Sequence, residues 1–276
     1  MATSTGQGGS RGDDALRIST SDTPGEHPAK DQSKRALRPK DAATLVLVDH
    51  TGTAPRILMG QRRSTQVFLP NKFVFPGGRV DRADRSMACL GALSGTDTTR
   101  LLHDMKGQPG ASRARALALA AIRETFEEAG IVIGEKPAQE AAKPRQSLDR
   151  AARPNDDPNQ PPRNSWQQFL ATGFKPSLAG LTFFARAITP PSRPRRYDTR
   201  FFMADARIIA HETGHSDDEL RKIGWFTLDE IRALDLPNIT RAVVEDLSLT
   251  LASPAYSRPV PYYRFVRGTF RRDLID

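Results

Sequence analysis

The chain has 276 residues and a formal net charge of +9 at pH 7, with 38% hydrophobic residues and one cysteine, Cys89. This composition is typical of a water-soluble chain of one large or two small domains, and the longest apolar runs are too short to span a bilayer. A single cysteine excludes an intrachain disulfide and indicates a reducing compartment, so we expect a cytoplasmic protein without a membrane segment.

The excess of positive charge favours anionic partners, of which phosphates and nucleic acids are the obvious classes. Alternatively, this charge lies in flexible tails that keep the chain soluble. Residues 1–38 are rich in Ser, Gly, Asp, Lys and Arg and show almost no aliphatic periodicity. We predict that they form a disordered tail.

Order is expected from about Asp41, beginning with short strands. Residues 43–48 form an apolar run followed by a turn, and residues 56–62 are its expected partner strand. Residues 68–75 then lead into Gly77 and Gly78. Paired glycines allow the backbone to approach a ligand or a metal closely.

A helical region follows these strands. Residues 81–110 have apolar positions typical of short helices, interrupted by several glycines. A longer helix is predicted over residues 113–129, with Ser112 as its N-cap and Gly130 as its C-terminal stop.

The end of this long helix carries three carboxylates on one face. Glu124, Glu127 and Glu128 stand at positions i, i+3 and i+4, which places them within an arc of about 100°. Like charges repel each other, so a helix gains from this arrangement only where a cation is held against it. Carboxylates on a rigid helix suit Mg²⁺.

The second half of the chain alternates a polar segment with further strands and helices. Residues 135–164 contain six prolines and many charges, which predicts a flexible surface loop. The elements expected after it are a helix over residues 165–170, strands over 178–187, 199–204 and 221–226, and helices from 227 and over 238–251. This order predicts an α/β fold with a mixed sheet between helices.

The last segment, residues 254–276, mixes arginines with tyrosines and phenylalanines. Such a basic aromatic tail suits nucleic-acid binding, since bases stack on aromatic rings and phosphates pair with arginine. Alternatively, the aromatic side chains pack on the preceding domain.

Together, Gly78 and residues 123–131 resemble the Nudix box, G-x5-E-x7-R-E-U-x-E-E-x-G-U, in which U is apolar. Two positions depart from the pattern: Thr125 stands at an apolar position, and Asp84 is the only counterpart of the first Glu. Residues 85–122 then replace the usual seven. The resemblance implies one Nudix-type domain over residues 39–253, an α/β/α sandwich with a helical insertion, residues 81–110, inside the box region.

The resemblance also implies roles for individual residues. It implies that Mg²⁺ or Mn²⁺ is held by Glu124, Glu127, Glu128 and the carbonyl of Gly78. Arg123 corresponds to the arginine that orients the glutamates through charge-assisted hydrogen bonds. Glu127, Glu124 and Glu219 are alternative general bases. Asp84 is shorter than Glu, and the long insertion removes its fixed helical spacing to the other glutamates, so we do not expect it to bind the metal.

The implied substrate is a nucleoside diphosphate linked to another moiety. Residues 61–78 and 196–202 resemble a long-insertion group of the family that includes a peroxisomal coenzyme A diphosphatase, so CoA or acyl-CoA is one candidate. Nucleotide sugars and dinucleotides are alternatives, as is a Nudix-fold module that binds nucleotides without catalysis. Arg62, Arg63 and Arg200 are the predicted phosphate contacts, since arginine binds phosphate in a bidentate manner. Nucleic acid is not required as a partner.

Overall fold

The computed structural model describes residues 37–66, 68–137, 164–214, 216–217, 219–253 and 258–276. The predicted disordered tail, 1–38, and the predicted flexible loop, 135–164, therefore lie almost entirely outside the described residues. Within them, no helix is long and apolar enough to cross a membrane.

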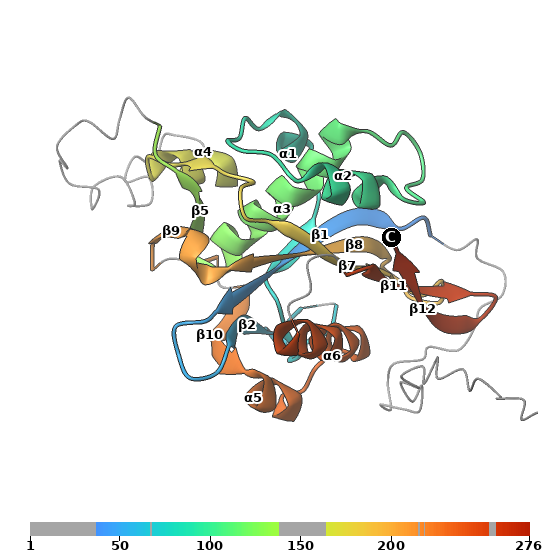
Figure 1. Ribbon diagram of the computed structural model, residues 1–276. Coiled ribbons are helices and arrows are strands. Elements are labelled where there is room, and N and C mark those ends of the chain that lie inside the picture. The colour runs from blue at the N-terminus through green and yellow to red at the C-terminus, as the bar shows by residue number, and fades with distance from the viewer. Residues whose placement is uncertain (1–36, 67, 138–163, 215, 218, 254–257) are drawn as a thin grey trace, which may run out of the picture.

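A mixed sheet forms the middle layer of the molecule (Figure 1). Its strands run in the order β10 (Leu220–Thr227), β2 (Arg56–Arg62), β1 (Lys40–Asp49), β8 (Tyr197–Asp205), β7 (Thr182–Ile188), β11 (Val260–Val266) and β12 (Thr269–Ile275). Two short strands, β3 (Phe73–Val74) and β4 (Gly77–Arg79), pair with β2 and β1. The pairs β1–β8 and β11–β7 are parallel and the other pairs are antiparallel, which confirms the predicted mixed sheet.

Helices cover both faces of this sheet, as expected for an α/β/α sandwich (Figure 1). One face carries α1 (Arg82–Ser86), α2 (Gly95–Leu102), α3 (Ala111–Ala129) and α4 (Ser165–Ala171), and the other carries α5 (Leu228–Ala233) and α6 (Asn238–Ala252). Near α3 and α4 lies a small sheet of β6 (Lys175–Pro176), β5 (Ile131–Glu135) and β9 (Ile209–Glu212). A 3-10 helix, Ala206–Ile208, joins β8 to β9.

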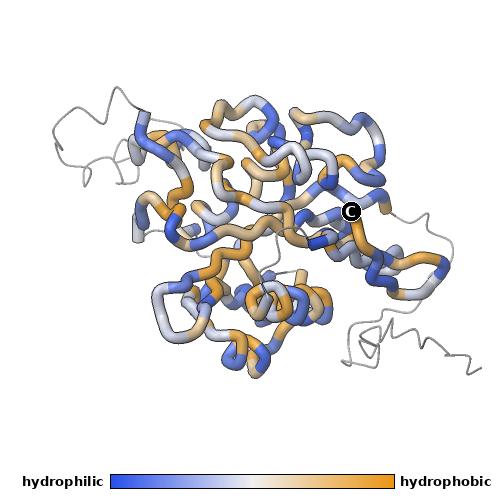
Figure 2. The backbone as a smooth tube through the Cα atoms, in the orientation of Figure 1, coloured by the Kyte–Doolittle hydropathy of each residue, from blue (hydrophilic) through white to orange (hydrophobic). Residues whose placement is uncertain are grey.

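Two apolar cores hold the layers together, one on each face of the sheet. The central strands are apolar along most of their length, and hydrophilic segments lie at the periphery (Figure 2). Every residue from Ala116 to Phe126 of α3 is buried, because its Ala- and Leu-rich sequence packs closely against β1. This helix is therefore a rigid support for the groups at its C-terminal end.

The helix α3 begins two residues earlier than the sequence predicts. Its N-cap is Gly110, so Ser112 lies inside the first turn and is not the cap. At the other end Gly130 adopts a left-handed conformation with φ 68°, and its N–H donates to the carbonyl of Phe126. The predicted C-terminal stop is confirmed, because this conformation favours glycine.

The prediction that residues 254–276 form a tail after the domain is wrong. Most of it forms the hairpin β11–β12, in which β11 extends the main sheet by pairing with β7. Tyr262 and Tyr263 are both 1% exposed, so the alternative in which the aromatic side chains pack on the domain is confirmed. The domain therefore extends beyond its predicted end at residue 253.

Candidate active site

The acidic face of α3 lies directly against the first residues of β4, Gly77 and Gly78, where the turn from β3 ends. The backbone N–H of Gly77 donates to Oε2 of Glu128 over 2.8 Å. A Cβ atom placed on Gly78 would lie 2.4 Å from Cδ of Glu124, closer than real side chains allow. The glycines thus let this turn contact the carboxylates, and Gly78, Glu124 and Glu128 come together as predicted.

Arg123 connects the carboxylates to one another. Its Nη1 lies 2.9 Å from Oε1 of Glu124 and 3.0 Å from Oε2 of Glu127. Its Nε donates to Oδ1 of Asp84 over 2.8 Å and its Nη2 to the carbonyl of Arg79 over 2.9 Å. Burial opposes the charge of Arg123, but the surrounding carboxylates outweigh this effect and raise its pKa.

Asp84 is fully buried and belongs to the support of the site. It accepts both hydrogen bonds that Arg123 directs toward it, and its Oδ1 also accepts a bond of 2.8 Å from the indole Nε1 of Trp166. Asp84 caps the start of α1, since its Oδ2 accepts from the backbone N–H of Asp81. The sequence showed no role for Trp166, which lies far along the chain in α4.

The environment raises the pKa of two of the glutamates. Burial raises the pKa of Glu124 to about 7, with Arg123 opposing and Glu127 adding to the shift. Burial and the charge of Glu124 raise the pKa of Glu128 well above its usual range, against the Gly77 N–H. Negative charge is therefore unfavourable here unless a cation neutralises it.

Carboxylate oxygens on a rigid helix beside a backbone turn fit the donor preference of Mg²⁺ or Mn²⁺. Among the residues that the structure describes, no three His, Cys, Asp or Glu side chains converge on a single point. Glu127 instead turns to Arg123, and Glu128 turns to the N–H of Gly77. The three glutamates can bind one ion together only if the side chains of Glu127 and Glu128 rotate. Their carboxylate oxygens are donors of the type that Mg²⁺ and Mn²⁺ prefer.

Comparison with known proteins assigns this arrangement to a family. The model of the NUDT19 Nudix domain matches residues 39–235. The chain belongs to this family. The Nudix domain is 29% identical over 205 residues to "Acyl-coenzyme A diphosphatase NUDT19" of Gallus gallus, covering 61% of this chain and 53% of that protein. It is also 29% identical over 165 residues to "Putative nudix hydrolase 7" of Caenorhabditis elegans, covering 59% of this chain and 43% of the relative.

The chain thus spans about half the length of the curated relatives that it matches. Among solved structures, the NUDIX hydrolase of Alicyclobacillus acidocaldarius aligns with a TM-score of 0.57 at 24% identity. The alignment covers 81% of this chain and all of that chain. This likeness confirms the Nudix fold.

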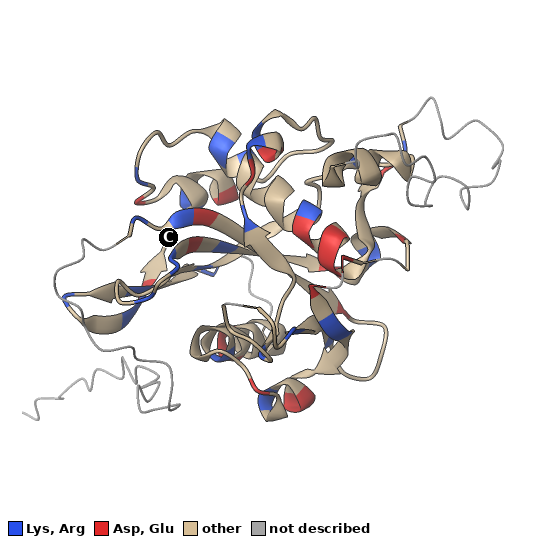
Figure 3. Cartoon of the chain, turned by 180° about the vertical axis from the view of Figure 1, so that it is seen from behind, with Lys and Arg blue, Asp and Glu red and all other residues tan. Residues whose placement is uncertain are grey.

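In this Nudix domain, Arg62 and Glu219 lie together beside the acidic face of α3. Arg62 Nη2 lies 3.2 Å from Oε1 of Glu219, and its Nε donates to the carbonyl of Phe68. The charge of Glu219 contributes to the raised pKa values of Glu124 and Glu128, and the charge of Arg62 opposes the rise in the pKa of Glu128. Acidic residues mark the last turns of α3 in Figure 3.

The segment before Glu219 is tied to the same helix. The backbone N–H of Asp217 donates to the carbonyl of Glu127 over 2.8 Å, and Oδ1 of Asp217 accepts from the N–H of Glu219. The side chain of Glu219 is 40% exposed. Its position at the edge of the acidic face is compatible with the predicted role as a base or an additional ligand.

The other two predicted phosphate contacts behave differently. Arg63 follows Arg62 at the end of β2 and is half-buried, so its role stays a prediction. Arg200 is fully buried in β8, with Nη1 2.8 Å from Oδ1 of Asp198 and 3.7 Å from Asp41. Burial lowers its pKa to about 10, which leaves it charged at neutral pH. The prediction that Arg200 binds substrate is wrong, because its guanidinium is enclosed in the protein.

Proposed function

We propose that this Nudix domain is a metal-dependent diphosphatase. It hydrolyses the diphosphate bond of a nucleoside diphosphate linked to another moiety. The observation that supports this proposal most strongly is the contact between the buried carboxylates of α3 and the turn at Gly77 and Gly78. A merely solvated acidic face would not place Glu124 and Glu128 directly against Gly78 and Gly77. Nor would it hold Glu124 and Glu127 through one shared partner, Arg123.

Glu124, Glu127, Glu128 and the carbonyl of Gly78 are the groups that would hold Mg²⁺ or Mn²⁺. When bound, such an ion would neutralise charge on the diphosphate and would make a water molecule more acidic. Arg123 holds Glu124 and Glu127 in place through its ion pairs with both carboxylates. Its additional bonds to Asp84 and the carbonyl of Arg79 fix its own position, which favours precise placement of the carboxylates.

Arg62 is the proposed contact for a substrate phosphate. Its guanidinium is held by Phe68 and Glu219 beside the acidic face, and a phosphate can replace or join Glu219 as its partner. Three groups remain candidates for accepting the proton of the attacking water. Glu124 titrates near neutral pH, Glu127 neighbours it, and Glu219 is exposed at the edge of the site.

We further propose CoA and acyl-CoA as the first substrates to test. The similarity to the Gallus gallus protein, whose name states acyl-coenzyme A diphosphatase, supports this choice over nucleotide sugars and dinucleotides. A reducing compartment, which the single cysteine favours, is compatible with a thiol substrate.

A substrate panel tests both parts of the proposal. CoA, acyl-CoA, ADP-ribose, a nucleotide sugar and a dinucleoside polyphosphate would be incubated with Mg²⁺ or Mn²⁺, or with EDTA, and the products separated by chromatography. The expected result is cleavage of CoA and acyl-CoA at the diphosphate, abolished by EDTA. Intact CoA beside cleaved nucleotide sugars would refute the substrate class alone. No metal-dependent cleavage of any compound would favour a binding module.

A further inference from the structure

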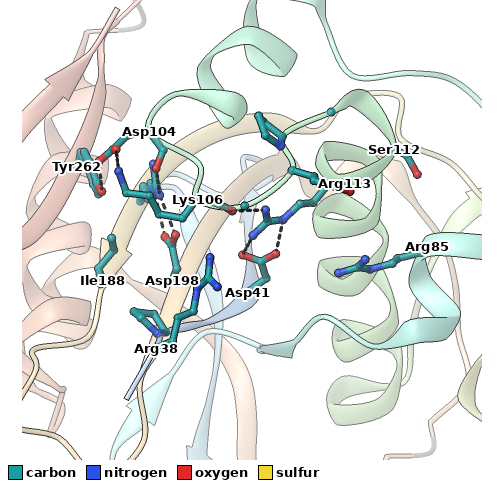
Figure 4. A pocket seen from close by; sticks show the side chains of 16 residues that line it. Arg38, Asp41, Arg85, Asp104, Lys106, Ser112, Arg113, Ile188, Asp198 and Tyr262 are labelled. Carbon is teal, nitrogen blue, oxygen red and sulfur yellow. Dashed lines mark hydrogen bonds and ion pairs between the residues drawn. The ribbon is translucent and has the colours of Figure 1, made fainter. Parts of the chain in front are cut away.

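A cavity of about 590 Å³ lies at the N-terminal end of α3 (Figure 4). The loop 104–110, the beginning of β1 and Tyr262 of β11 surround it. Ser112, which lines this cavity, precedes Glu124 by twelve residues, a separation of about 18 Å along a helix. The cavity is therefore distinct from the acidic face, and its volume is typical of sites for small organic molecules.

The floor of the cavity carries an excess of positive charge. Arg113 binds Asp41 through two nitrogens, over 2.6 and 2.9 Å, and Arg186 binds Asp198 through two nitrogens, over 2.8 and 2.7 Å. The buried Arg200 lies behind both carboxylates and shares them. Three arginines thus face two carboxylates, which leaves one positive charge uncompensated.

Two further arginines add to this charge at the rim. Arg38 and Arg85 both line the cavity and are exposed, and neither forms an ion pair with any residue that the structure describes. Figure 4 shows the guanidinium of Arg38 beside Asp41, while the side chain of Arg85 lies farther from Asp41, across α3. The remaining lysine of the lining, Lys106, is paired with Asp104 over 2.6 Å and is therefore neutralised.

The N-terminus of α3 also favours an anion in this cavity. This helix of 19 residues has no acidic residue in its first turn, and its N-cap, Gly110, has no side chain to accept from the first N–H groups. The N-terminus of a helix of this length is a favourable place for an anion. Ser112 in the first turn is exposed and places a hydroxyl at the same opening.

We propose that this cavity binds the phosphate group of a small organic phosphate. Arg38 and Arg85 would contact the phosphate from the rim while the first turn of α3 faces it, and the uncompensated floor attracts it. Pro109 and Ile188, which also line the cavity, offer apolar surface to the organic part. This site does not depend on the proposed diphosphatase activity.

Calorimetric titration with inorganic phosphate and with AMP tests the proposal, using the full chain in EDTA so that the acidic face carries no divalent ion. We expect saturable binding, tighter for AMP than for inorganic phosphate. Ser112→Asp should weaken AMP binding by at least about tenfold, because it places a negative charge at the anion site. Ser112→Asn, which has nearly the same shape without the charge, should bind as the wild type does.

Position 112 was also chosen so that a loss of binding cannot be explained by a loss of folding. A carboxylate in the first turn stabilises a helix, so Ser112→Asp should keep the thermal stability of the wild type while its affinity for AMP falls. Arg85→Gln should also weaken binding, and Arg62→Gln beside the acidic face should not. Absence of binding at millimolar AMP, equal affinity for AMP and phosphate, or loss of binding in Arg62→Gln alone would overturn the proposal.

Discussion

At the scale of single residues, Gly78 decides whether the turn and the acidic helix can touch. We predict that Gly78→Ala lowers diphosphatase activity by at least about tenfold, because the new methyl group would overlap the carboxylate of Glu124. Activity and thermal unfolding should be measured together. Gly95→Ala is the matched control, since a Cβ there meets nothing within 4 Å. Full activity in Gly78→Ala would show that the turn does not confine Glu124.

The raised pKa of Glu124 predicts how the stability of the fold depends on pH. Because burial raises its pKa from 4.5 to about 7, the folded chain without divalent ions keeps a proton that the unfolded chain releases between these values. The contribution of this group is therefore most favourable at low pH, and it is lost as the pH rises through this window.

The measurement is the thermal midpoint in EDTA from below pH 4.5 to above pH 7. The wild type should lose stability relative to Glu124→Gln as the pH rises, and added Mg²⁺ should restore it most at the upper end. Parallel pH profiles of the two proteins would contradict the raised pKa.

At the scale of elements, the site depends on the junction of α1, α3 and α4. Asp84 of α1 accepts hydrogen bonds from Arg123 of α3 and from Trp166 of α4. We predict that Trp166→Phe destabilises the fold by about 1–3 kcal/mol, since a buried acceptor loses a donor. It should also lower kcat more than it changes KM, because Arg123 would be held less firmly.

Urea unfolding and steady-state kinetics would measure both effects. Trp225→Phe is the comparison, because Trp225 packs against the core from β10, whereas the indole that donates to Asp84 is that of Trp166. An unchanged kcat in Trp166→Phe would show that α4 does not contribute to the orientation of Arg123.

The elements differ in how well the sequence predicted them. The C-terminal end of α3 was predictable because Gly130 and the glutamates are local signals. The support of Arg123 was not, because Asp84 and Trp166 lie 39 and 82 residues from their partners. The burial of Arg200 was not predictable for the same reason, since only the fold reveals that it lies inside the sheet against Asp198.

At the scale of the whole molecule, the C-terminal hairpin completes the sheet. The hydroxyl of Tyr263 donates to Asp246 of α6, and Arg272 of β12 binds the same carboxylate over 2.6 and 3.0 Å. The arginines in this hairpin hid its strand character, because they resemble a solvated basic tail in the sequence. The fold pairs Arg264, Arg271 and Arg272 with aspartates.

We predict that Tyr263→Ala costs about 3–5 kcal/mol of unfolding free energy, since it removes a large buried side chain. Tyr263→Phe should cost less, because it keeps the ring and leaves Asp246 bound to Arg272. Urea unfolding compares the variants. Wild-type stability in Tyr263→Ala would indicate that the hairpin is dispensable.

The central claim is that the acidic face of α3 is a metal-dependent hydrolytic site. The most direct test measures Mn²⁺ binding and CoA or acyl-CoA cleavage in the wild type, Glu127→Gln and Glu128→Gln, with thermal unfolding as the check on folding. We predict that each variant stays folded, binds Mn²⁺ more weakly and loses activity by orders of magnitude, because one charged oxygen ligand is lost. Wild-type rates and Mn²⁺ affinity in both variants would contradict the assignment of the site.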